Sequence, residues 1–218
     1  MNDIMVQIIV LAGILLFLVL KLRSVLGTRE GFEKPRVEWE APRRNGPDLE
    51  VIEGGVDADI TDHVPAGSKA AKALAEMKKI EPEFNVTEFL QGARGAYEMI
   101  LMAFENGDLE SVVPFLSKDV YEAFASVIDE REEKGLNVEA TFVGLREMEL
   151  KDADFDPKTR EAEITVKFVG ELTSVVRDRD GEIIEGNPEE IHRQKDVWTF
   201  ARIMGSDDPN WKLVATDG

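Results

Sequence analysis

The sequence predicts an α+β domain in which helices pack on a curved antiparallel sheet, preceded by one hydrophobic helix at the N-terminus. Three observations support this fold class. An apolar run spans residues 4–20, apolar side chains repeat at helical spacing between residues 68 and 135, and apolar and polar side chains alternate in stretches between residues 138 and 216. Helices followed by consecutive strands are typical of a helical layer on an antiparallel sheet.

The N-terminal apolar run is predicted to be a membrane anchor. It holds one polar side chain, Gln7, and at about 1.5 Å per residue it lies at the short end of a bilayer-spanning helix. A cleaved signal peptide and a buried core helix are the alternatives. Asp3 precedes the run and Lys21 follows it where a cleavage site would stand, which favours an uncleaved anchor. The anchor residues include Ile4, Ile14, Phe17 and Leu20.

Basic residues flank the anchor on one side only. Lys21, Arg23 and Arg29 follow it, whereas no Lys or Arg precedes it. The positive-inside rule therefore places the C-terminal body in the cytoplasm and the N-terminus outside. The chain has no cysteine, which excludes disulfides and thiolate metal sites. We expect a single-pass protein of the bacterial inner membrane.

The chain is strongly acidic. Its 44 acidic and 26 basic residues give a formal net charge of -18. This excess repels phosphate backbones and anionic lipid surfaces, so nucleic acid is not expected as a ligand. Attachment to a membrane is expected through the hydrophobic helix rather than through charge.

Composition divides the chain into three parts. Residues 1–26 form the anchor with its basic flank, and residues 27–66 form an acidic linker rich in Pro and Gly without a sustained period of 3.6 or 2. Self-repulsion should keep this flexible linker extended. Residues 67–218 form the α+β domain.

The domain is predicted to begin with an amphipathic helix over residues 68–82. Ser68 is its N-cap, and apolar and basic side chains lie largely on opposite sides. Two interpretations remain open for the apolar stripe. It either packs on the domain, or it binds a partner or a membrane surface.

Local signals define the following helices. Asn85 caps a long helix that Gly107 ends, a short helical stretch covers residues 109–116, and Ser117 caps a helix that stops at Gly135.

Strand patterns fill the rest of the chain. Strands are predicted over residues 138–150, 161–176, 193–203 and 211–216, with turns at Asp180-Gly181 and residues 207–210. The acidic segment Asp152–Asp156 is interpreted as a polar hairpin turn. With Glu163 it partly fits a calcium loop, but Pro157 stands where such a loop needs glycine, so calcium is the lesser alternative.

Several separated blocks of sequence resemble the Tim44-like domain family. They are Phe89–Ile100 (FLQGARGAYEMI), Ala103-Phe104, Gly107-Asp108, Asp196–Arg202 (DVWTFAR) and Asp208–Leu213 (DPNWKL). Residues 22–27 after the hydrophobic run resemble the bacterial members in particular. Blocks in the right order are more specific than one short motif.

The resemblance implies a cone-shaped α+β fold of the nuclear-transport-factor-two type, usually with an apolar pocket. It also implies a scaffold role at membranes, since the family is named for the scaffold of the mitochondrial inner-membrane import motor. Seven residues are therefore candidates for a pocket or partner surface: Phe89, Ala93, Tyr97, Leu101, Trp198, Phe200 and Trp211.

No pattern of residue spacing indicates a catalytic, cofactor-binding or metal-binding site. His63 and His192 are the two histidines and are interpreted as surface residues. We expect a membrane-tethered scaffold or adaptor that is not an enzyme. Its partners would be translocation, chaperone, ribosome or membrane-complex components. The alternatives are an apolar-ligand or lipid-binding protein, or an isomerase or dehydratase of the same cone fold that uses a buried carboxylate.

Overall fold

The structure, a computed structural model, describes residues 57–217. The predicted anchor, its basic flank at Lys21 and Arg23, and the linker up to residue 56 lie outside the described residues. Between residues 57 and 217 no helix is long and apolar enough to cross a membrane.

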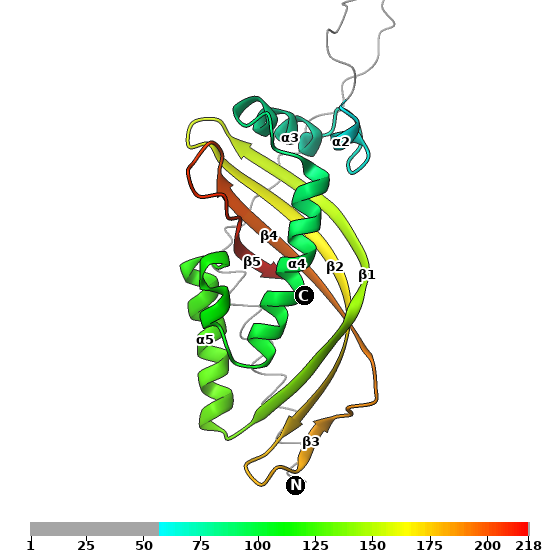
Figure 1. The fold of residues 1–218 in the computed structure, drawn as a ribbon, viewed down its shortest axis with the longest axis vertical. Helices are drawn as coiled ribbons and strands as arrows, with labels where there is room; N and C mark the ends of the chain where they lie inside the picture. Colours follow the sequence, from blue (N-terminus) through cyan, green and yellow to red (C-terminus); the bar gives the residue numbers. More distant parts are fainter. Residues whose placement is uncertain (1–56, 218) are drawn as a thin grey trace, which may run out of the picture. The chain divides into compact units, whose positions relative to one another are not determined.

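Helices come first along the chain and strands follow (Figure 1). The helices are α2 (Ala58–Thr61), α3 (Lys69–Ile80), α4 (Val86–Glu105), the 3-10 helix η1 (Glu110–Phe115) and α5 (Lys118–Glu133). The strands are β1 (Asn137–Asp156), β2 (Glu161–Arg177), β3 (Ile183–Gly186), β4 (His192–Ile203) and β5 (Lys212–Asp217).

The predicted helix ends are confirmed by their caps. The side-chain oxygens of Ser68, Asn85 and Ser117 each accept a backbone N–H from the first turn of α3, α4 and α5, at 3.1, 2.8 and 3.3 Å. These bonds satisfy donors that have no partner inside the helix. Gly107 and Gly135, with φ of +73° and +68°, follow α4 and α5 and take a conformation that glycine adopts without strain.

The strands form one antiparallel sheet. Its order is β1-β2-β4-β5, and β3 pairs with β2. β1 lies at an edge and carries three register shifts, between Phe142 and Gly144, Leu145 and Glu147, and Leu150 and Asp152. Such irregularities bend and twist a strand. Figure 1 shows α4 lying across one face of the curved sheet, which confirms the predicted α+β arrangement of helices on an antiparallel sheet.

The apolar face of α3 packs on the rest of the domain. Leu74 and Met77 are fully buried, and α3 contacts β1. The packing interpretation of the helix over residues 68–82 is therefore confirmed.

One turn prediction was wrong, and one strand was not predicted. Asp152–Asp156 is not a turn but the last part of β1, paired with residues 161–165 of β2. The turn begins at Pro157, and Asp154 forms an ion pair with Lys69 of α3. Pairing with β2 and burial of Ala153 outweigh the turn propensity of the aspartates. The sequence interpretation also missed β3, a short strand whose four residues are all exposed.

The folded domain includes residues before the predicted boundary at residue 67. Helix α2 lies within the predicted linker, and Ile60 and Val64 are buried in the core at 4% and 5% exposure. Residues 57–64 therefore belong to the folded domain.

Candidate functional site

Aromatic side chains fill the space between α4 and the sheet. Tyr97 of α4 is fully buried and stacks on Phe168 of β2, with ring centroids 4.4 Å apart and planes inclined by 10°. The ring of Trp198, from β4, lies 4.8 Å from that of Tyr97. Paired rings of this kind stabilise a core beyond the area that they bury.

A second aromatic group lies nearer the start of α4. The ring of Phe89 lies 4.8 Å from that of Trp211 and 6.1 Å from that of Phe200. Phe84, just before α4, also contacts Trp211 at 5.9 Å. Through Phe200, which lies 6.5 Å from Phe168, the two groups are continuous.

The structure brings the seven candidate residues into one core. Six are buried and Trp211 is partly buried against the same cluster: Phe89, Ala93, Tyr97, Leu101, Trp198 and Phe200 are the buried ones. Binding of a ligand or partner by these residues stays a prediction.

A buried carboxylate accompanies the aromatic core. Asp196 is 8% exposed, and its Oδ2 accepts a hydrogen bond of 2.6 Å from the hydroxyl of Tyr97. Its Oδ1 accepts a second bond of 3.1 Å from the amide of Gln194. Burial and the neighbouring Asp196 carboxylate raise the pKa of Tyr97 above its usual value, so the phenol stays protonated and keeps donating.

The sheet leaves little room around this hydroxyl. A Cβ placed on Gly170 of β2 would stand 2.8 Å from the Tyr97 hydroxyl oxygen, which is closer than real contacts of this kind. A side chain at this position would force the Tyr97 hydroxyl or the strand to shift, so Gly170 leaves the space in which Tyr97 reaches Asp196.

A second acidic side chain lies near the end of α4. Burial raises the pKa of Glu105, and Asp196 adds to this effect while Arg131 opposes it. The Nη1 atom of Arg131 lies 3.9 Å from Glu105 Oε2, and the guanidinium stands 4.6 Å from the ring centroid of Phe104. Arg131 thus joins α5 to α4 by charge and by a cation–π contact.

Arg202 of β4 forms an ion pair with Glu81, which follows α3. Its Nη2 donates to both carboxylate oxygens of Glu81, at 2.9 and 2.7 Å. A surface depression of about 330 Å³ lies beside Arg202 and is lined mainly by β4, β5 and the loop between them. It is separate from the seven candidates.

These features define an α+β domain whose helix-facing side is closed by aromatic side chains around one buried Tyr–Asp pair. The Tim44-like domain family matches residues 70–218, and the chain belongs to this family. The resemblance seen in the sequence is thereby confirmed.

Curated relatives are similar at low identity. The human mitochondrial import inner membrane translocase subunit TIM44 is 23% identical over 162 residues, which are 72% of this chain and 35% of that protein. TIM44-1 of Arabidopsis thaliana is 22% identical, over 71% of this chain and 34% of the relative. The probable subunit tin-44 of Caenorhabditis elegans is 21% identical, over 73% and 38%. The chain thus spans about a third of the length of these relatives.

One solved structure is also similar. The intermembrane space region of the chloroplast protein ARC6 has a TM-score of 0.40 and 14% identity, over 59% of this chain and 94% of that chain.

Proposed function

We propose that this protein is a non-enzymatic scaffold that binds protein partners in protein translocation, tethered to the bacterial inner membrane by residues 4–20. The observation that carries the proposal is the family match over residues 70–218, together with relatives named as inner membrane translocase subunits.

The interior of the domain supports a binding role on its surface. Tyr97 is fully buried and stacked on Phe168, and Asp196 is engaged by Tyr97 and Gln194. A substrate that approached Asp196 from the side of α4 would have to displace these rings. A scaffold uses its outer surface and has no need to open this core.

The experiment is crosslinking and affinity purification of the full-length protein from bacterial membranes. The matched control is residues 1–56 alone, which carry the predicted anchor and linker. We expect translocation, chaperone, ribosome or membrane-complex components to crosslink to the full-length protein and not to the control. Equal recovery of the same proteins with both would refute a scaffold function of the domain.

The membrane tether is tested separately. Because residues 4–20 are apolar, the full-length protein should stay in the membrane pellet after carbonate washing. A reporter that is active in the cytoplasm should be active when it is fused to the C-terminus. Extraction by carbonate would refute the anchor, and activity of a periplasmic reporter would refute the orientation.

The enzyme alternative rests on one observation, the buried Asp196 beside Tyr97. An isomerase or dehydratase that used Asp196 as a base should lose turnover in Asp196→Asn while it still binds substrate. The scaffold proposal expects instead that Asp196→Asn lowers stability and leaves partner crosslinking intact in the folded fraction. The lipid-carrier alternative would show as lipid extracted from the purified protein.

A further inference from the structure

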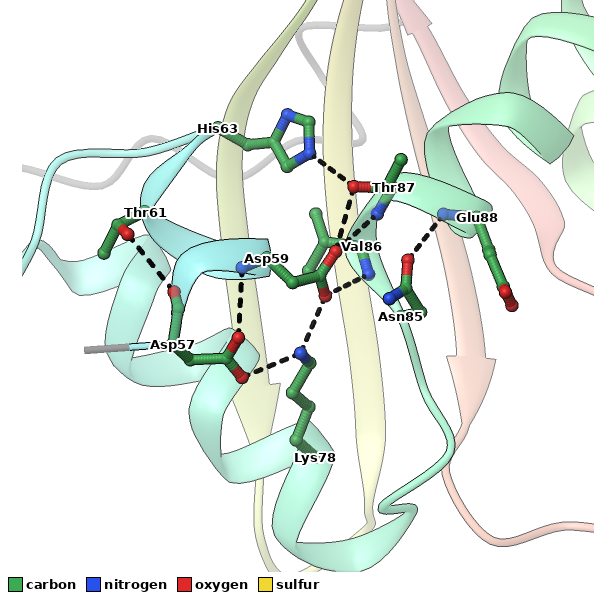
Figure 2. Close-up of polar contacts among 9 residues, drawn as sticks. All are labelled: Asp57, Asp59, Thr61, His63, Lys78, Asn85, Val86, Thr87 and Glu88. Atoms are coloured by element: carbon green, nitrogen blue, oxygen red, sulfur yellow. Dashed lines mark hydrogen bonds and ion pairs between the residues drawn. The ribbon is translucent and has the colours of Figure 1, made fainter. Parts of the chain in front are cut away.

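Residues 57–64 are attached to α4 by the carboxylate of Asp59 (Figure 2). Its Oδ2 accepts the backbone N–H of Val86 at 2.8 Å, and its Oδ1 accepts the N–H and the hydroxyl of Thr87 at 3.0 and 2.9 Å. Val86 and Thr87 are the first two residues of α4, so their N–H groups have no partner within the helix. An acidic side chain there also interacts favourably with the helix dipole.

The same segment is attached to α3 by Lys78. The ammonium of Lys78 lies 2.7 Å from Asp59 Oδ2 and 2.8 Å from Asp57 Oδ2. Burial alone would raise the pKa of Asp59, but the hydrogen bonds from Lys78, Val86 and Thr87 outweigh it and lower the pKa from 3.8 to about 2. His63 adds a contact of 3.0 Å between its Nε2 and the hydroxyl of Thr87. The polar contacts therefore converge from α2, α3 and α4.

Apolar contacts hold the other side of the segment, and an exposed link follows it. Ile60 and Val64 are buried in the core cluster. Pro65, Ala66 and Gly67, which connect the segment to α3, are all exposed. Gly67 has φ of +75°, and a Cβ there would have no neighbour within 4 Å. The link is therefore free to change conformation without disturbing packed side chains.

We propose that residues 57–64 are a strap that fixes the point where the N-terminal segment joins the domain, and that this strap opens while α3, α4 and the sheet stay folded. The strap lies before the family match, which begins at residue 70. Opening breaks the contacts of one short helix and leaves the contacts of α4 with the sheet unchanged. Elements with few buried residues are the ones that open locally.

An open strap would uncover a defined surface. It would expose two backbone N–H groups at the start of α4, the ammonium of Lys78 and the apolar surface on which Ile60 and Val64 pack. This inference depends on the proposed function in one respect only, the attachment of the N-terminal segment to the membrane. Its opening is measured in the purified chain, so failure of the strap and failure of the scaffold are distinguishable.

The test is hydrogen exchange of the full-length chain as wild type, Asp59→Asn and Asp62→Asn. Asp62 lies next to α2 with an exposed side chain, so Asp62→Asn is the matched control. Loss of hydrogen bonds to a charged group should speed exchange of the amides of residues 61–64 by about tenfold to a hundredfold in Asp59→Asn. The Glu81 amide, which bonds to Met77 at the end of α3, and the α4 amides from Phe89 onward should exchange at the wild-type rate.

A second variant guards against an effect of charge alone. Ile60→Ala removes buried methyl groups and keeps every charge of the strap, and it should also speed exchange of residues 61–64 selectively. Equal exchange of these amides in Asp59→Asn and Asp62→Asn would overturn the proposal. Equal acceleration of the strap, α3 and α4 in Ile60→Ala would overturn it as well, because the strap would then open only with the whole domain.

Discussion

The hydroxyl of Tyr97 allows a sharp test of the buried polar pair. Tyr97→Phe removes one oxygen and leaves the ring that stacks on Phe168. Asp196 would lose its donor at 2.6 Å and keep only the amide of Gln194 at 3.1 Å. A hydrogen bond to a charged group contributes about 1.5–3 kcal/mol, so we expect the free energy of unfolding to fall by about 2 kcal/mol. For a domain of this size that lowers Tm by roughly 4–8 °C.

The assay is urea unfolding followed by tryptophan fluorescence, because Trp198 lies 4.8 Å from Tyr97. The matched control is Tyr121→Phe on α5, where the side chain is 37% exposed, and it should change stability by less than about 0.5 kcal/mol. Tyr97→Phe and Asp196→Ala should be non-additive when combined, since they remove the same bond. An unchanged stability of Tyr97→Phe, or strict additivity, would refute the coupling.

Three further predictions concern pH and packing. Burial and Asp196 raise the pKa of Tyr97 above its ordinary 10.0. The stabilisation by the protonated Tyr97 side chain is therefore complete below pH 10 and is lost as the pH rises further. The unfolding curves of wild type and Tyr97→Phe should converge as the pH rises above 10. The pKa of Asp59 is lowered from 3.8 to about 2. The contribution of the ionised Asp59 to the free energy of unfolding is therefore complete above pH 3.8 and is lost as the pH falls toward 2. Acid unfolding of Asp59→Asn should lack this pH dependence, whereas Asp62→Asn should retain it. Gly170→Ala should destabilise by about 1–3 kcal/mol in urea because its Cβ meets the Tyr97 hydroxyl, whereas Gly144→Ala, with open space around the Cβ, should stay near wild type.

Local signals in the sequence were enough to predict α3, α4 and α5, but not the short helix α2. Ser68, Asn85 and Ser117 cap helices that begin at the next residue, and the periodicity of α4 placed Tyr97 on its buried face. Each of these signals depends on neighbours within one or two turns. The order of helices followed by antiparallel strands also predicted the layered fold.

Contacts between distant residues could not be predicted in the same way. Tyr97 and Asp196 are separated by 99 positions, and Arg202 and Glu81 by 121. The strand conformation of Asp152–Asp156 depends on β2 as a partner, and composition alone suggested a turn. The attachment of α2 depends on Asp59 reaching the start of α4, which nothing within the linker composition indicates.

The irregular path of β1 has a consequence for solubility. In the described sheet β1 is the outermost strand on one side, and a straight strand at such a position offers its backbone N–H and C=O groups to any other extended chain. The three register shifts interrupt that repeat, and the exposed side chains of Arg146, Glu147 and Lys151 place charges along it. Neighbouring copies of the protein are therefore hindered from adding strand to strand at β1, so this edge of the sheet disfavours aggregation.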